Sequence, residues 1–210
     1  MYLLVKRIFD FSLAIVGLIG SAPLCLLLAA LIFLEDGRPI FFSQERCGRA
    51  GRIFRLYKFR SMKKGQNTIL DIPSGPDSRL TSIGRLLRAV ALDELPSLYH
   101  IVKGDMSFVG PKALLPRVAD PADPDGGKSI CEVDGFKVRS AVMVGLTGLA
   151  QLNAPKNASY RSKFRYDALY VKHLGLWLDL KLLLASFVRT FYGGWERISV
   201  KRGKNTSKRD

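Results

Sequence analysis

The sequence predicts a small α/β domain joined to an apolar N-terminal membrane segment. Three observations support this fold class. Residues 11–34 carry no charge, residues 40–44 and 53–59 alternate apolar and polar side chains around a turn, and several later segments have apolar residues at helical spacing. The chain has 210 residues, 48% of them hydrophobic and 24% charged. This composition suits one folded domain of ordinary size and excludes a globally disordered chain.

The N-terminal apolar run is long enough to enter a bilayer. Residues 11–34 exceed the ~20 residues that span a membrane and the ~7–15 residue core of a signal peptide. Ser21 and Pro23 lie mid-run beside two glycines, and proline predicts a break because it removes a backbone donor and clashes with the preceding turn. Basic residues flank the run on both sides, and such residues stay cytoplasmic. Two interpretations remain open: a helix–break–helix with arms of ~18 Å that returns to one side, and a single spanning helix.

The remaining elements follow in order. Residues 40–44 and 53–59 predict two strands of a hairpin around a turn at 47–52. A short helix is expected over 83–89, a helix from Asp93 or Glu94 to Val102, a polar helix over 159–173, and an apolar helix over 174–192 that lies either along a membrane face or in the core. Residues 63–79 and 116–128 are expected to be loops. The domains are therefore an anchor over 1–36, the domain that carries the chemistry over 37–199, and a basic disordered tail over 200–210.

Charge is distributed unevenly along the chain. The net charge is +15; residues 1–70 hold 11 basic and 4 acidic side chains, residues 71–135 hold 7 and 10, and residues 136–210 hold 15 and 4. This pattern suits a protein that binds anionic partners, whether nucleic acid, a membrane face or phosphorylated substrates. The three cysteines, at 25, 47 and 131, are odd in number and widely spaced, which favours reduced thiols over a disulfide framework or a zinc site.

Adjacent carboxylates at Asp93 and Glu94 are the strongest candidate for catalysis. They lie between Leu92 and Leu95, in the acidic part of a basic chain. At a helix start they would be near free N–H groups and the positive end of the dipole, which can bind phosphate. The same field would keep Asp93 ionised, as a nucleophile or a metal ligand must be. The alternative is two ordinary acids at a helix N-terminus.

Other polar segments allow both a functional and an ordinary interpretation. Residues 103–112, with two glycines and two lysines, suit a phosphate-binding turn or a plain loop. The arginines at 46, 49, 52 and 55 suit a solvated face, or one or two of them bind diphosphate. His100 and His173 have no partner at metal-ligand spacing, and each is expected to be structural.

Read together, six segments resemble the monotopic phosphoglycosyl transferases, the bacterial sugar transferase family. They occur in the family's order and cover nearly the whole chain. The matching segments are residues 6–10 (KRIFD), the break at Ser21 and Pro23, 57–62 (YKFRSM), 92–96 (LDELP), 104–111 (GDMSFVGP) and 145–151 (GLTGLAQ).

The resemblance implies a function that composition does not. Family members move a sugar 1-phosphate from a UDP-sugar to a polyprenol phosphate, commonly undecaprenyl phosphate, releasing UMP and requiring Mg²⁺. The aspartate at position 93 would bind the metal, attack the β-phosphate and form a phosphosugar–enzyme intermediate, with Glu94 as its partner carboxylate. The resemblance also implies a re-entrant helix, surface helices among membrane lipids, and a catalytic domain on the cytoplasmic face of the bacterial inner membrane. The residues expected to bind substrate phosphates are Lys58, Arg60, Arg88, Lys112, Arg139 and Gln151.

The sequence departs from the family pattern at several positions. Lys112-Ala113 replaces the usual Arg-Pro, so the bidentate guanidinium contact is lost; Cys47 replaces a proline, Leu149 replaces a common tryptophan, and a short insertion follows Arg139. Two rival hypotheses remain: a membrane-tethered binder of nucleic acid or anionic lipid, and an inactive relative serving as a scaffold. The transferase interpretation expects no nucleic acid partner. The sequence leaves open the sugar, the downstream glycan, and whether the protein is a monomer or a homodimer.

Overall fold

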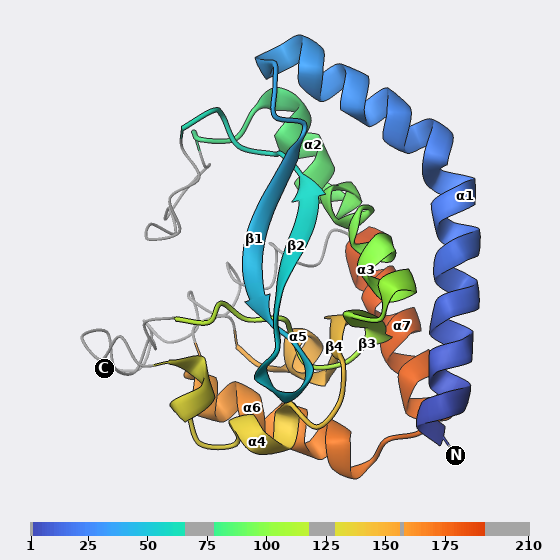
Figure 1. Cartoon of the computed structure of the whole chain (residues 1–210), viewed down its shortest axis with the longest axis vertical. Helices are drawn as coiled ribbons and strands as arrows, with labels where there is room; N and C mark the ends of the chain where they lie inside the picture. The colour runs from blue at the N-terminus through green and yellow to red at the C-terminus, as the bar shows by residue number, and fades with distance from the viewer. Residues whose placement is uncertain (1, 66–77, 118–128, 156–157, 192–210) are drawn as a thin grey trace, which may run out of the picture.

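A computed structural model describes residues 2–65, 78–117, 129–155 and 158–191, and Figure 1 shows their arrangement. The predicted tail over 200–210 and much of the two predicted loops lie outside these residues. In chain order the elements are α1 (Tyr2–Asp36), β1 (Phe41–Cys47), β2 (Ile53–Phe59), α2 (Ser82–Ala89), α3 (Ser97–Lys103), β3 (Met106–Val109), α4 (Phe136–Arg139), β4 (Val144–Thr147), α5 (Leu149–Asn153), α6 (Tyr160–Lys172) and α7 (Leu176–Phe191), with short 3₁₀ turns η1 (Arg49–Gly51), η2 (Leu92–Glu94) and η3 (Ile130–Glu132).

The N-terminal segment forms one helix of 35 residues, α1, with Pro23 inside it. The predicted break at Ser21 and Pro23 is therefore not an interruption of the helix, although Figure 1 shows α1 changing direction before its C-terminal end. The Ser21 hydroxyl donates to the carbonyl of Leu18 at 3.5 Å. The helix is long and apolar enough to cross a membrane, and at 1.5 Å per residue it is about 52 Å long.

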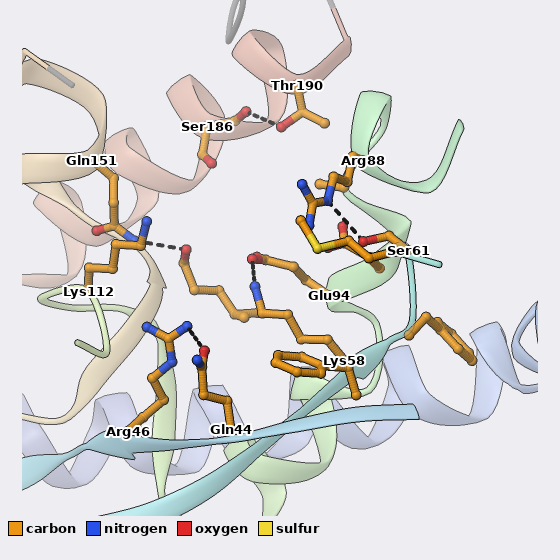
Figure 2. Close-up of a pocket in the computed structure, with 16 residues that line it drawn as sticks. Gln44, Arg46, Lys58, Ser61, Arg88, Glu94, Lys112, Gln151, Ser186 and Thr190 are labelled. Carbon is orange, nitrogen blue, oxygen red and sulfur yellow. Dashed lines mark hydrogen bonds and ion pairs between the residues drawn. The ribbon is translucent and has the colours of Figure 1, made fainter. Parts of the chain in front are cut away.

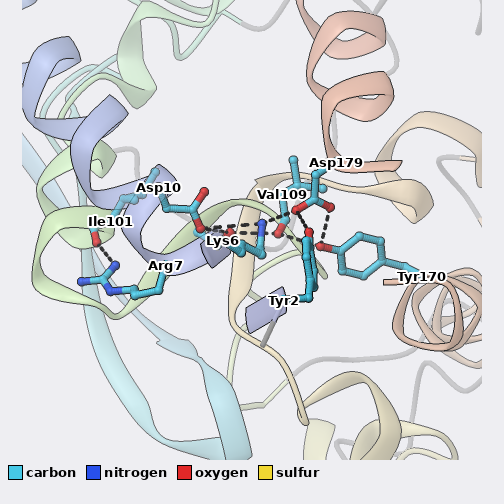
Figure 3. A network of polar contacts seen from close by, with 9 residues as sticks. Tyr2, Lys6, Arg7, Asp10, Ile101, Val109, Tyr170 and Asp179 are labelled. Carbon is cyan, nitrogen blue, oxygen red and sulfur yellow. Dashed lines mark hydrogen bonds and ion pairs between the residues drawn. The ribbon is translucent and has the colours of Figure 1, made fainter. Parts of the chain in front are cut away.

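The first turns of α1 are bound to the folded domain through a buried polar network (Figure 3). The Lys6 ammonium donates to Asp179 Oδ2 of α7 at 2.5 Å, and the Ser107 hydroxyl of β3 donates to Asp10 Oδ2 at 2.6 Å. Tyr2 and Tyr170 also donate to the Asp179 carboxylate, at 2.6 and 2.8 Å. The carboxylates of Asp10 and Asp179 and the ammonium of Lys6 thus find hydrogen-bond partners within the protein.

The last residues of α1 are bound to the same domain. Glu35 accepts from the backbone N–H groups of Ser82 and Ile83, at 2.6 and 3.0 Å, so its carboxylate satisfies free donors at the start of α2. The Arg60 guanidinium donates to the carbonyls of Asp36 and Gly37, both at 2.9 Å. Between the two ends, apolar residues of α1 pack on α2, α3 and β2.

The predicted hairpin is confirmed. Strands β1 and β2 pair antiparallel with Phe41 opposite Phe59 and Cys47 opposite Ile53. The burial pattern alternates along both strands, as expected when one face packs on a core. Phe54 and Leu56 point into the cluster that includes Leu98 and Ile101 of α3.

A second, two-stranded parallel sheet joins β3 to β4, with Met106 opposite Val144 and Val109 opposite Thr147. Residues 103–112 were expected to be a phosphate-binding turn or a plain loop; instead they hold the end of α3 and a buried strand. The glycines beside it allow close backbone approach, because a Cβ on Gly145 would lie 2.1 Å from the nitrogen of Gly110. Close packing of the two strands therefore accounts for Gly110 and Gly145 in the family-like segments 104–111 and 145–151.

The two C-terminal helices occur where the sequence predicts them. The Ser159 hydroxyl caps α6 by accepting from the backbone N–H of Ser162. Helix α7 buries Leu182 in the cluster with Val109 and Tyr170, whereas Trp177, Leu184 and Phe187 are exposed. The two alternatives for this segment, a surface helix and a core helix, thus describe opposite faces of the same helix.

Candidate active site

A cavity of about 550 Å³ lies between the hairpin, the turn η2, the segment after β3, and helices α5 and α7. Figure 2 shows its lining from close by. Both predicted catalytic carboxylates and four of the six predicted phosphate-binding residues line it. The lining residues are Phe42, Gln44, Arg46, Lys58, Phe59, Ser61, Met62, Arg88, Ala91, Asp93, Glu94, Lys112, Leu146, Gln151, Ser186 and Thr190.

The carboxylate pair lies in a 3₁₀ turn and not at a helix start. Helix α3 begins at Ser97, because Pro96 takes the capping position, and η2 covers Leu92–Glu94. Ala91 before it has φ of 56°, a left-handed conformation that a residue with a Cβ rarely adopts. This backbone reversal brings Asp93 and Glu94 to the cavity wall. The predicted helix start at Asp93 or Glu94 is thus wrong by three or four residues.

Burial, followed by repulsion from the neighbouring Glu94 carboxylate, raises the pKa of Asp93 to about 6, with Lys58 and Arg88 opposing the shift. The helix start that was expected to keep Asp93 ionised is absent at this position, because Asp93 lies in η2 and α3 begins at Ser97. The α-helix begins beyond it, so the dominant influence is loss of water. A carboxylate with a pKa near 6 is still mostly ionised at pH 7. The nearby cations offset only part of the cost of burying the Asp93 charge, as is common for reactive groups.

Two cations border the carboxylate pair directly. Lys58, on β2, forms an ion pair with Glu94. Arg88, near the end of α2, donates from Nε to the Ser61 hydroxyl at 2.9 Å. Its two terminal nitrogens have no partner among the described residues and could bind a ligand. These positions suit the neutralisation of a phosphate near Asp93.

Two further cations extend the positive lining. Desolvation lowers the pKa of Lys112, while Glu94 opposes the shift. Arg46, on β1, donates to the carbonyl of Ala113 at 3.2 Å and to the side chain of Gln44, and its Nε is buried with no partner in the described residues. The cavity thus combines two carboxylates with four basic side chains.

The other predicted binding residues differ in their placement. Gln151 lines the cavity, and its amide donates to the carbonyl of Leu146 at 3.0 Å while its oxygen is buried without a partner in the described chain. Arg60 does not line the cavity, because its buried guanidinium holds the end of α1. Arg139 does not line it either. It pairs with Asp167 at 2.8 Å and donates to the carbonyl of Lys112 at 2.6 Å, so it supports the segment that carries Lys112.

Several cavity residues were missed or left undecided by the sequence. Of the arginines at 46, 49, 52 and 55, only Arg46 lines the cavity. Strand alternation could have selected it, because Gln44 and Arg46 share one face of β1 with Phe42. Ser186 and Thr190 come from α7, far from any motif, and no sequence signal pointed to them. His100 is structural as expected: it is buried, and its Nε2 accepts from the backbone N–H of Tyr57 at 3.1 Å.

The donor set fits a magnesium ion held jointly with substrate. Among the residues that the structure describes, no group of three or more His, Cys, Asp and Glu could hold a metal. Mg²⁺ is usually bound through one or two carboxylates plus substrate phosphates and water. Asp93 and Glu94 on one cavity wall match that mode.

Comparison with known proteins assigns most of the chain to one family. The family model described as Bacterial sugar transferase matches residues 1–193. The uncharacterized sugar transferase EpsL of Bacillus subtilis is 37% identical over 182 residues, which are 86% of this chain and 84% of that protein. The exopolysaccharide production protein ExoY of Rhizobium meliloti is 34% identical over 194 residues, covering 85% of this chain and 81% of the relative.

Longer relatives share the same region. The UDP-N-acetylgalactosamine-undecaprenyl-phosphate N-acetylgalactosaminephosphotransferase of Aeromonas hydrophila is 33% identical over 198 residues, which are 92% of this chain but 45% of that protein. The undecaprenyl-phosphate galactose phosphotransferase of Salmonella typhimurium is 34% identical over 194 residues, 85% of this chain and 38% of the relative. The chain thus spans less than half the length of these two relatives.

Proposed function

The chain belongs to the bacterial sugar transferase family, and from this premise we propose that it transfers a sugar 1-phosphate from a UDP-sugar to a polyprenol phosphate. Undecaprenyl phosphate is the expected acceptor, since relatives named as phosphotransferases use it. The observation that carries the proposal is the cavity that sets Asp93 and Glu94 among Lys58, Arg88 and Lys112. Such a lining suits a ligand with several phosphate charges beside a nucleophilic carboxylate. The product would begin a glycoconjugate such as an exopolysaccharide.

The proposed first step uses Asp93 as the nucleophile. One oxygen of its carboxylate attacks the β-phosphorus of the UDP-sugar and forms an aspartyl phosphate bond. The bond from that phosphorus to the bridging oxygen breaks, and UMP leaves with this oxygen and the electron pair. Lys58 and Arg88 lie close enough to influence Asp93 and would offset the repulsion between the carboxylate and the diphosphate.

The proposed second step regenerates the enzyme. A phosphate oxygen of the polyprenol phosphate attacks the same phosphorus, the bond to the Asp93 oxygen breaks, and the carboxylate is restored. The product is a sugar linked to the lipid through a diphosphate. Glu94, paired with Lys58, keeps that lysine beside the reacting groups.

Asp93 and Glu94 are the residues that would hold Mg²⁺ together with the diphosphate. When bound, the ion supplies positive charge that stabilises the departing UMP. The assignment rests on the position of both carboxylates in one cavity, where a bound cation would stabilise the ionised form of Asp93.

We also propose that α1 enters and leaves the membrane on one side. Lys6 and Arg7 near its start and Glu35 and Asp36 at its end all bond to the same folded domain, whereas a spanning helix would leave one end in the opposite compartment. Apolar side chains are exposed along the whole helix, from Leu4 (68%) through Ile19 (71%) to Leu34 (78%). This exposed surface suits lipid contact, with the catalytic domain at the cytoplasmic face of the inner membrane.

Cysteine labelling tests the placement of α1. Single cysteines at Leu3 and at Lys64, in a background without the native thiols, should both react with a membrane-impermeant maleimide from the cytoplasmic side only. Reaction of the Leu3 position from the opposite side would contradict re-entry.

The activity is tested by UMP release. Purified protein in detergent, with Mg²⁺ and undecaprenyl phosphate, is screened against a panel of UDP-sugars, with Asp93→Asn in parallel. Release that requires the metal and disappears in the variant supports the proposal and identifies the donor. No release by folded protein from any donor would contradict it and favour the scaffold hypothesis.

A further inference from the structure

Helix α7 has two chemically different faces, and the polar one reaches the cavity. Asp179 near its start is held by the network with Lys6 and Tyr170. Ser186 and Thr190 follow seven and eleven positions later, which places all three on one side of an α-helix. Ser186 and Thr190 line the cavity, and Figure 2 shows the Ser186 side chain directed into it.

The opposite face of α7 is apolar and open. Leu180, Leu184 and Phe187 are exposed, as is Trp177, the second residue of the helix. The exposed fractions of these side chains range from 39% for Leu180 to 70% for Trp177. The wall of the cavity that carries the serine is therefore also a surface suited to lipid.

The Ser186 hydroxyl has no hydrogen bond partner among the described residues, whereas the Thr190 hydroxyl donates to the carbonyl of Ser186 at 3.0 Å. The serine lies within α7, and Arg189 of the same helix donates to the carbonyl of Leu152 in α5. Ser186 is thus a hydrogen-bond donor on the cavity wall, and the described residues offer its hydroxyl no acceptor.

A cation lies across the cavity on an element of the same character. Figure 2 shows Arg88 and Ser61 facing the α7 wall. Two positions before and after Arg88, Leu86 of α2 and Val90 just past the helix are both exposed. Two walls of the cavity therefore present a hydrogen-bond donor inward and apolar side chains at neighbouring exposed positions.

We propose that Ser186 donates a hydrogen bond to the phosphate of the lipid acceptor, opposite Arg88, with the polyprenol chain lying over the apolar face of α7. The inference rests on the proposed transferase function and names a contact for its second substrate. An amphipathic ligand with an anionic head and an apolar tail matches both faces of the helix. A nucleotide sugar is polar throughout and matches only the inner face.

The test separates the two half-reactions. In the absence of acceptor, enzyme mixed with the UDP-sugar releases UMP only as the covalent intermediate forms. With acceptor, turnover reports the second step. Ser186→Ala should leave the rate and amplitude of the first UMP release unchanged. It should raise the KM for undecaprenyl phosphate about tenfold or more, as expected for the loss of one hydrogen bond to a charged group.

Two further variants complete the experiment. Ser186→Thr keeps the hydroxyl and should restore most of the acceptor KM. Ser162→Ala, on α6 and outside the cavity lining, removes a comparable hydroxyl and should change neither half-reaction.

Three results would overturn the inference. They are an unchanged acceptor KM in Ser186→Ala, a slowed first UMP release with an unchanged acceptor KM, and failure of Ser186→Thr to restore the acceptor KM. Absence of UMP release from the unaltered enzyme with every donor would instead reject the transferase function itself, so the two failures can be told apart.

Discussion

Replacing Asp93 by asparagine should abolish UMP release and at the same time stabilise the fold at neutral pH. Burial, followed by repulsion from Glu94, raises the pKa of Asp93 from 3.8 to about 6. A shift of this size corresponds to about 3 kcal/mol, which the folded state loses when Asp93 ionises. Asparagine has nearly the same shape and carries no charge, so it removes this cost.

The sign of the pH dependence follows from proton binding. Between pH 3.8 and 6 the folded protein holds a proton on Asp93 that the unfolded chain releases, so stability falls as the pH rises through this window. The full cost is present above pH 6, and about half of it remains at pH 5. At 2–4 °C per kcal/mol for a chain of this size, the Asp93→Asn variant should unfold up to about 6–12 °C higher at pH 8, with a smaller gain at pH 5.

Thermal unfolding in detergent without added Mg²⁺, followed by circular dichroism at both pH values, measures this difference. Asp105→Asn is the matched control with the opposite expected sign. Burial alone would raise the pKa of Asp105, but hydrogen bonds from Lys103 and His100 lower it, so losing its charge should destabilise the protein at pH 8. An Asp93→Asn variant no more stable than the unaltered protein at pH 8, or one with equal gains at both pH values, would refute the reasoning.

Three other perturbations test the scaffold around the site. Lys6→Met should destabilise by about 3–5 kcal/mol, because it leaves the buried Asp179 carboxylate without its cation; thermal unfolding measures the loss, and Asp179→Asn in the same chain should recover part of it. Gly145→Ala should cost about 3 kcal/mol, measured in the same way, since the added Cβ would lie 2.1 Å from the backbone nitrogen of Gly110, just past β3. Acidification should weaken the fold through His100, because burial lowers the pKa of this histidine below 6.5. The stability that neutral His100 contributes is complete above pH 6.5 and is lost as the pH falls toward the lowered pKa. His100→Gln should flatten this part of the plot of stability against pH.

Each of these predictions has a distinct contradicting outcome. Additive losses in the Lys6 and Asp179 double variant would mean that the two residues do not interact. Gly20→Ala is the control for Gly145→Ala, because nothing lies within 4 Å of its added Cβ, and equal losses in the two would show that crowding is not the cause. An unchanged pH profile in His100→Gln would show that this histidine does not titrate with unfolding.

Local patterns predicted the elements whose structure depends on nearby residues. The hairpin and α6 have clear periodicity, turn residues at the right offset, and a serine cap at Ser159. The parallel pair of β3 and β4 was missed, because its strands have four residues each and are separated by more than thirty. A parallel ladder with glycines at close backbone contacts has little alternation for a pattern to reveal.

The candidate site was predictable only where its residues belong to local sequence motifs. Asp93, Glu94 and Lys58 belong to motifs that the sequence displays, and they meet at the cavity. The sequence could not indicate that Arg60 holds the end of α1 or that Arg139 pairs with Asp167, since an arginine motif does not reveal which acceptor lies nearest. The same limit applies to Ser186, which enters the cavity only because α7 folds back across it.

The covalent intermediate on Asp93 is the central claim, and one measurement addresses it directly. Enzyme, Mg²⁺ and the active UDP-sugar labelled at the β-phosphate are mixed without lipid, and the protein is digested and analysed by mass spectrometry. The account predicts about one UMP released per enzyme, with sugar phosphate on the peptide that contains Asp93. Adding undecaprenyl phosphate should then remove the label. UMP release that begins only when lipid is present, or label on another residue, would contradict the account.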